Sequence, residues 1–123
     1  MRAPASEYVS VGGRPWQERR SGVHWKVLHE DGDRRTVLVR YEAGAIVPRH
    51  RHLGDEQIFV IEGSVSDETG TCHAGDFARR PPGCVHTVRS AGGALVLAVM
   101  SGGTEAISDS APLCPEPRAR ENS

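Results

Sequence analysis

The sequence predicts a single domain made of β-strands, either a sandwich or a barrel, and three observations support this prediction. The 123 residues are enough for one compact domain and too few for two of ordinary size. Short segments with the composition of strands alternate with turns, in a chain that contains 14 glycines and 8 prolines. No segment repeats apolar residues at the i, i+3, i+4 and i+7 spacing of an amphipathic helix. Many short strands at regular turn spacing are typical of all-β sandwiches and barrels.

The expected strands follow one another along the chain, each ended by turn residues. Residues 23–27 alternate apolar and polar side chains, as a strand with one buried face does. The further strand-like segments are residues 36–41, 45–47, 58–61, 64–66, 70–73, 76–79, 86–89 and 95–100. Glycine, proline and aspartate mark the turns between them, as in Asp31-Gly32-Asp33 and Pro81-Pro82-Gly83. We therefore predict one domain over residues 16–101.

The two ends of the chain lack this pattern. Residues 1–15 are expected to form an N-terminal arm, in which Tyr8, Val9 and Val11 could add a strand at the edge of the sheet. From residue 102 the chain is polar and rich in proline, so residues 102–123 are expected to form a flexible C-terminal tail.

Residues 58–61 and 95–100 are apolar at every position instead of alternating. A strand of this kind has both of its faces covered. Only one face can point into the interior of a small barrel, so a second copy of the chain is the expected cover for the other face. The sequence therefore predicts a homodimer.

Charge and hydropathy exclude several classes of function. The 15 basic and 16 acidic residues give a net charge of −1, so the chain lacks the excess of Lys and Arg expected of a nucleic-acid-binding surface. The longest strongly apolar run, residues 94–100, is far shorter than the roughly 20 residues of a membrane-spanning helix. The polar sequence after Met1 contains no signal-peptide core. A cytoplasmic location is expected, with neither nucleic acid nor a membrane as a partner.

Three histidines and one glutamate form a candidate metal site. His50 and His52 are two residues apart, so in an extended strand both imidazoles lie on one face while the neighbouring arginines lie on the other. Glu56 follows after a short turn, and His86 follows a rigid Pro-Pro-Gly turn. Three imidazoles and a carboxylate suit one divalent ion such as iron, manganese, nickel, copper or zinc, and leave positions for water, substrate or dioxygen. A His-x-His pair alone is a weak signal, because six histidines produce close pairs by chance.

The spacing of glycine and proline around these residues strengthens the assignment. Residues Gly44, His50, His52, Glu56 and Gly63 resemble the first cupin motif at every position. Residues Gly75, Pro81, Gly83 and His86 resemble the second cupin motif, with Ser90 where the family often has Asn. The resemblance implies that His50, His52, Glu56 and His86 bind one divalent metal ion per chain.

Further segments resemble the ChrR-like cupins. They are Trp16, Gly22-Val23, Lys26-Val27-Leu28, Val39-Arg40-Tyr41, His50-Arg51-His52, Glu62-Gly63, Ser66-Asp67-Glu68, Ala74-Gly75-Asp76 and Arg80-Pro81-Pro82-Gly83. The resemblance covers residues 16 to about 100 and implies a double-stranded β-helix, the cupin jelly-roll, usually as a dimer. This family includes the C-terminal domain of zinc-binding anti-sigma factors. It also includes enzymes that use iron and dioxygen to cleave carbon–carbon bonds in diketones and hydroxyketones.

The resemblance leaves two classes of function open. The first is an iron-dependent, dioxygenase-like enzyme acting on a small organic molecule that chelates the ion through a carbonyl oxygen; with another metal the site suits an isomerase or a lyase. The second is a non-catalytic, metal-containing sensor or regulatory module. Gln57 stands where relatives often have an acid. The chain also lacks the length and the His-x3-Cys-x2-Cys motif of an anti-sigma zinc domain, so a direct anti-sigma role is not expected.

Two further features each allow two interpretations. Cys84 lies two residues before His86, so in an extended segment its thiol is on the side of that ligand. We interpret it as a small packed hydrophobic residue, with a redox-sensitive group as the alternative. The Arg79-Arg80 pair is interpreted as a solvent-exposed edge, with recruitment of an anionic group as the alternative.

Overall fold

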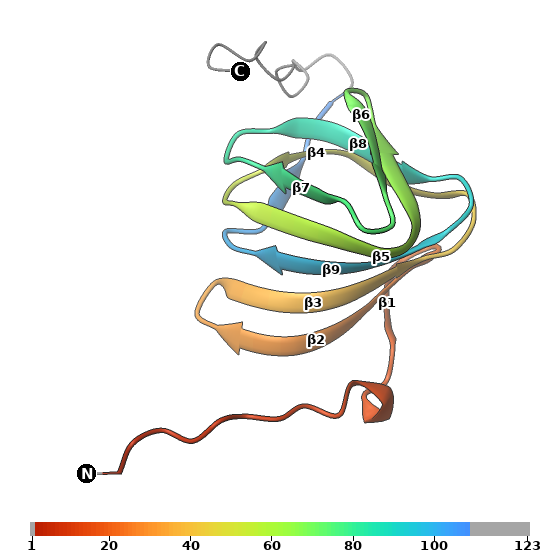
Figure 1. Ribbon diagram of the computed structural model, residues 1–123. Helices are drawn as coiled ribbons and strands as arrows, with labels where there is room; N and C mark the ends of the chain where they lie inside the picture. The colour runs from red at the N-terminus through yellow and green to blue at the C-terminus, as the bar shows by residue number, and fades with distance from the viewer. Residues whose placement is uncertain (1, 109–123) are drawn as a thin grey trace, which may run out of the picture.

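The computed structural model describes residues 2–108 and confirms the predicted all-β fold (Figure 1). A short 3₁₀ helix, η1 (Val11–Gly13), precedes ten strands. The strands are β1 (Gln17–Arg20), β2 (Val23–Asp31), β3 (Arg34–Tyr41), β4 (Ala45–His52), β5 (Glu56–Asp67), β6 (Gly70–His73), β7 (Phe77–Arg80), β8 (Val85–Ser90), β9 (Ala94–Met100) and β10 (Thr104–Ala106). Across residues 2–108, no helix has the length and apolar character needed to cross a membrane.

The strands form one antiparallel sheet that curls into a half-barrel (Figure 1). Along the sheet their order is β1-β2-β3-β9-β5-β8-β4-β10, and β6 and β7 each pair with β5. The first half of β5 pairs with β9 and β7. Its second half pairs with β6 and meets β8 at Ser66 and Arg89. β5 therefore connects the part of the curled sheet that contains β9 and β7 with the part that contains β6 and β8.

β5 is longer than the sequence predicts. Strands are expected at residues 58–61 and 64–66 with a break at Glu62-Gly63, but one strand of 12 residues covers both segments. Its register with β9 shifts between Val60 and Glu62, so the strand bends there instead of ending. Gly63 has a φ of +73°, and a Cβ on it would overlap the carbonyl oxygen of Gly93. Only glycine permits both this conformation and this close approach.

The core consists mainly of valine and other small aliphatic residues contributed by both halves of the barrel. Its buried members are Val23, Val37, Val39, Ala45, Ile58, Val60, Val65, Cys72, Val88, Ala94, Val96 and Ala98. The two wholly apolar segments turn only one face into this core: Ile58 and Val60 are buried, whereas Phe59 and Ile61 are 45% and 43% exposed. An apolar outer face therefore remains on this part of the sheet.

The ends of the domain differ from the prediction. The edge strand is β1, at residues 17–20, and not a segment among residues 8–11. Residues 104–106, which are predicted to belong to a flexible tail, form β10 and pair with β4. This three-residue strand, Thr-Glu-Ala, is exposed along its length, so no alternation of side chains reveals it in the sequence. The remainder of the predicted tail, residues 109–123, lies outside the described residues.

The turn between β4 and β5 fits closely against the chain that follows β9. The backbone N–H of Ser101 donates to the carbonyl of Asp55 (2.9 Å), and the N–H of Leu53 donates to the carbonyl of Gly103 (3.0 Å). A Cβ on Gly54 would overlap the carbonyl oxygen of Ser101. Glycine at this position thus lets the two segments touch, which holds the turn that leads from His52 to Glu56.

Gly54→Ala is expected to lower the free energy of unfolding by about 1–3 kcal/mol, because the added methyl group meets backbone atoms that have little room to move. Equilibrium denaturation in urea measures the change. Gly70→Ala is the matched control, because nothing lies within 4 Å of a Cβ at that position. It should alter stability by less than about 0.5 kcal/mol. Equal stability of the two variants would contradict the close fit at Gly54.

Candidate metal centre

The fold brings the three predicted histidines together inside the barrel. His50 and His52 lie on β4 and His86 lies on β8, and these residues are 9%, 4% and 1% exposed. β4 and β8 are antiparallel neighbours whose register places His50 opposite His86. The register shifts between Val47 and His50, at Pro48, which has no N–H for the ladder. Residues that are distant in sequence thus form one buried cluster.

The three imidazoles turn their Nε2 atoms toward one another. Nε2 of His52 lies 3.2 Å from Nε2 of His50 and 2.9 Å from Nε2 of His86. Two nitrogens bound at right angles to one ion, each about 2.1 Å from it, lie about 3.0 Å apart. The observed spacing therefore suits three ligands on one side of a single metal ion.

Hydrogen bonds at the opposite ring nitrogens define the tautomers of two of these histidines. Nδ1 of His50 donates to the carbonyl oxygen of Pro48 (2.7 Å), which can only accept. Nδ1 of His86 donates to Oδ2 of Asp67 (2.8 Å). In both rings Nε2 then carries a lone pair directed at the shared point. Such lone pairs repel one another unless a cation lies between them, so the donor set fits a divalent metal ion.

Burial keeps the three imidazoles neutral. It lowers the pKa of His50 and of His86, and together with the two neighbouring imidazoles it lowers the pKa of His52 to about 3. The positive charge of Arg80 acts on all three in the same direction. Neutral imidazole is the form that binds a metal. At neutral pH, these rings can therefore take up an ion without first losing a proton.

Asp67 is a functional candidate that the sequence analysis did not identify. Besides the proton of His86, its carboxylate accepts hydrogen bonds from the N–H and hydroxyl groups of Thr69, both at 2.8 Å, and from the N–H of Gly70 at 3.2 Å. Burial alone would raise the pKa of Asp67, but the hydrogen bonds from His86 and Thr69 hold it below the usual value. The sequence signal was the segment 66–68, which resembles ChrR-like cupins. Only the fold shows that the end of β5 faces His86.

Glu56, the predicted fourth ligand, begins β5 and lies beside the histidines. Its Oε1 is 3.9 Å from Nε2 of His52, outside the compact group of three nitrogens. Burial raises the pKa of Glu56, and the charge of Arg80 opposes this shift. Coordination by Glu56 therefore stays a prediction. The neighbouring Gln57 is exposed and donates a hydrogen bond to Asp55 (3.1 Å).

A cavity of about 490 Å³ adjoins the histidine cluster. Aliphatic side chains form much of its wall, namely Val23, Val39, Val47, Ile58, Val88, Val96, Ala98 and Met100. Tyr41 also lines it, and burial raises the pKa of Tyr41, so its hydroxyl group stays protonated. Arg19 and Arg20 of β1 and Arg35 of β3 supply positive charge to the same cavity. Its size and its combination of an aliphatic wall with charged and polar groups suit a small organic molecule that carries polar atoms.

Two other residues from the sequence analysis lie away from this cavity. Cys84 precedes β8 and is 3% exposed, and Arg80 ends β7 and is 6% exposed. Both line a second cavity. The interpretation of Arg79 as a solvent-exposed residue is confirmed, whereas for Arg80 it is wrong, because the strand turns alternate side chains to opposite faces.

Several solved structures have the same fold. A proposed acetylacetone dioxygenase from Methylibium petroleiphilum shares 19% sequence identity at a TM-score of 0.79, over 93% of this chain and 90% of the other. An acetylacetone dioxygenase from Acinetobacter johnsonii shares 19% identity at a TM-score of 0.78, over 92% and 85%. The complex of Rhodobacter sphaeroides SigE with the anti-sigma ChrR matches at 27% identity and a TM-score of 0.67, over 74% of this chain and 51% of that chain.

These likenesses confirm the predicted cupin fold. No curated protein matches the chain. The model of the ChrR cupin-like domain, however, matches residues 4–104, which is most of the sequence and includes all four predicted ligands. The chain therefore belongs to the ChrR cupin-like family.

Proposed function

We propose that this protein is a mononuclear, metal-dependent enzyme of the dioxygenase type, acting on a small diketone or hydroxyketone that chelates the ion. The observation that carries the proposal is the convergence of three neutral imidazole nitrogens beside a cavity with an aliphatic wall. Two proteins of similar structure support the choice of substrate class. One is an acetylacetone dioxygenase, and the other is a proposed acetylacetone dioxygenase.

The protein's own groups would hold the ion and prepare the site. His50, His52 and His86 would bind it through Nε2, with Glu56 as the predicted fourth ligand. When bound, a divalent ion such as Fe(II) supplies Lewis acidity toward a chelating carbonyl and a centre for reaction with dioxygen. Zinc, manganese, nickel and copper accept the same ligands, so availability selects the metal.

The cavity wall would orient the substrate and exclude water. Its aliphatic side chains provide no hydrogen bonds, so a small carbonyl compound can pack against them while its oxygen atoms face the histidines. Tyr41 keeps its proton and can donate a hydrogen bond within the cavity. The carboxylate of Glu56, which is partly buried and whose pKa is raised by desolvation, is also suited to receive a proton from an acidic C–H group.

Asp67→Asn is expected to weaken metal binding about 10–100-fold, because the amide nitrogen in place of Oδ2 cannot accept the proton of His86 Nδ1. The amide oxygen can still accept the N–H groups of Thr69 and Gly70, so the turn should persist. Titration in competition with a chromophoric chelator measures the affinity. Asp76→Asn is the control, because Asp76 is exposed and accepts the backbone N–H of His73. Equal affinity in the two variants would remove Asp67 from the site.

The proposed activity is tested by metal content and oxygen uptake. The protein purified without an affinity tag should contain close to one metal ion per chain, and the His50→Ala, His86→Ala double variant should contain none. His29→Ala, at an exposed position of β2, should keep its metal. The iron-loaded wild type should consume dioxygen when acetylacetone is added. Equal metal in the wild type and the double variant would show that the ligand set is wrong.

The second candidate function is a metal-containing regulatory module. The match to the SigE–ChrR complex favours it, since this is the likeness with the highest sequence identity of the three described above. The matched region spans about half of that chain, so the activity of the whole protein does not follow from it. One bound zinc ion per chain, with no oxygen uptake from diketones or hydroxyketones after iron loading, would support this function over the enzymatic one.

We also propose that two chains pair through the apolar outer face of β5, β7 and β9. Phe59, Phe77 and Val99 are 45%, 61% and 38% exposed, and Phe59 is the register partner of both Phe77 and Leu97. A contiguous exposed apolar surface of this kind is typical of an interface. Phe59→Asp combined with Phe77→Asp should therefore give the mass of one chain by light scattering, where the wild type gives two. Ile46→Asp, at an exposed apolar position of β4, should remain dimeric. A monomeric wild type would contradict the proposal.

A further inference from the structure

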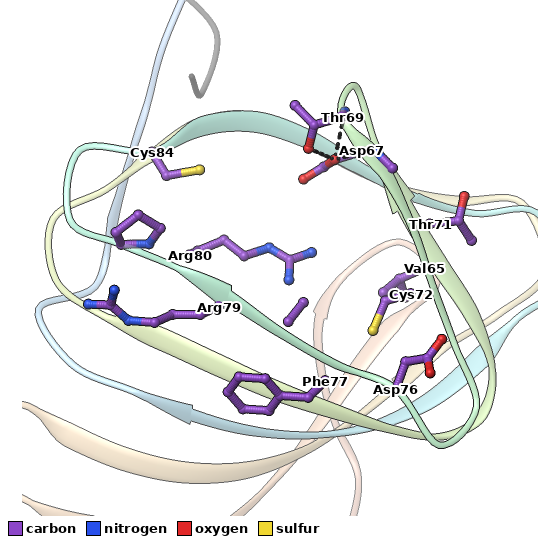
Figure 2. Close-up of a pocket in the computed structure, with 13 residues that line it drawn as sticks. Val65, Asp67, Thr69, Thr71, Cys72, Asp76, Phe77, Arg79, Arg80 and Cys84 are labelled. Atoms are coloured by element: carbon purple, nitrogen blue, oxygen red, sulfur yellow. Dashed lines mark hydrogen bonds between the residues drawn. The ribbon is translucent and has the colours of Figure 1, made fainter. Parts of the chain in front are cut away.

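A second cavity of about 610 Å³ lies between the end of β5, β6, β7 and the segment that leads from β7 to β8 (Figure 2). It has no lining residue in common with the cavity beside the histidines. Val65, Cys72 and Ala78 give it an apolar side, and Thr69 and Thr71 contribute hydroxyl groups. The proposed metal chemistry makes no use of this space.

Arg80 is the unusual residue of this cavity. It is 6% exposed, and its Nε and Nη1 atoms are buried without a hydrogen-bond partner. Within residues 2–108, the ion pairs of 4.0 Å or less include none with Arg80. By contrast, the adjacent Arg79 has a half-exposed side chain and pairs with Asp55 at 2.6 Å. Arg79 also lines the cavity, but Figure 2 shows its guanidinium directed away from that of Arg80, which points toward the middle of the ring of lining residues.

A buried guanidinium without a hydrogen-bonded anion is energetically costly, and native proteins rarely leave such donors unsatisfied. Glu56 is the register partner of Arg80 across β5 and β7, and the two charges influence one another. Glu56, however, lines the other cavity and is the predicted metal ligand. Glu56 does not accept a hydrogen bond from Nε or Nη1 of Arg80, so these atoms have no acceptor.

We propose that this second cavity binds a small organic monocarboxylate, whose oxygen atoms accept hydrogen bonds from the guanidinium of Arg80. A carboxylate matches one buried positive charge and the planar geometry of guanidinium donors. Its apolar part would pack against Val65 and Ala78. A phosphate dianion suits the site less well, because Asp67 and Asp76 also line the cavity and would repel its second charge.

Benzoate is a suitable probe, and benzamide is its neutral counterpart of nearly the same shape. The full chain is first treated with a chelator, so that the carboxylate cannot bind to a metal ion at the histidines, and binding is measured by calorimetry near neutral pH. Benzoate should bind at one site per chain. Benzamide should bind at least about tenfold more weakly because it loses the charge-assisted hydrogen bond, and inorganic phosphate at least about tenfold more weakly because Asp67 and Asp76 repel its second charge. Equal binding of benzamide, or no saturable binding up to about 10 mM benzoate, would overturn the proposal.

Two variants assign the site to Arg80. Arg80→Gln should weaken benzoate binding about tenfold or more, whereas Arg89→Gln removes a positive charge from an exposed position of β8 outside the cavity lining and should leave binding unchanged. Equal loss in both variants would point to general charge and against a site at Arg80. If Arg80→Gln does not fold, amide chemical shifts of the wild type locate the ligand. Shifts confined to residues 65–72 and 78–80 support the proposal, and shifts confined to β4 and the Val88 region of β8 contradict it.

Discussion

The pairing of β4 with β8 is the interaction on which the candidate site depends. Side chains alternate between the two faces of a strand, so a slip of one residue would move His50 and His52 out of the barrel and turn their arginine neighbours inward. The irregularity at Pro48 comes immediately before His50, and it also places a carbonyl group where the imidazole can donate to it. β5 then supplies Asp67 to hold His86. The register of β4 with β8 and the bend of β5 thus bring the histidines and Asp67 together.

The ionisable groups near this pairing respond to burial in different ways. Burial lowers the pKa values of the imidazoles and keeps them neutral, whereas Asp67 keeps its charge because hydrogen bonds from His86 and Thr69 stabilise it. Glu56 is under opposing influences, since burial favours its neutral form and Arg80 favours its charged form. A divalent ion among the nitrogens would add a larger positive charge beside this carboxylate and favour ionisation. The state of Glu56 therefore depends on whether the neighbouring nitrogens hold an ion.

Sequence patterns were sufficient to predict the class of fold and the histidine cluster. Alternation over residues 23–27 revealed a strand, and the His50-x-His52 spacing placed two ligands on one face. Asp67 could not be recognised in this way, because its role depends on a bend at Gly63 that the sequence suggested was a break. β10 could not be predicted because its residues show no strand pattern in the sequence. It is a strand only through its pairing with β4. The burial of Arg80 depends on which way β7 faces, and an Arg-Arg pair does not reveal that.

The position of β10 has a consequence for how this protein behaves at high concentration. Without it, β4 would end the sheet and offer a row of free backbone groups to any strand of another molecule, the usual start of edge-to-edge aggregation. The three residues of β10, two of them polar, cover that row where they pair with residues 50–52. At the opposite end of the sheet order, β1 is only four residues long, and its sequence Gln-Glu-Arg-Arg is polar throughout. Short, charged strands at both ends make uncontrolled growth of the sheet unfavourable, so the ligand-bearing strand is also protected from joining a fibril.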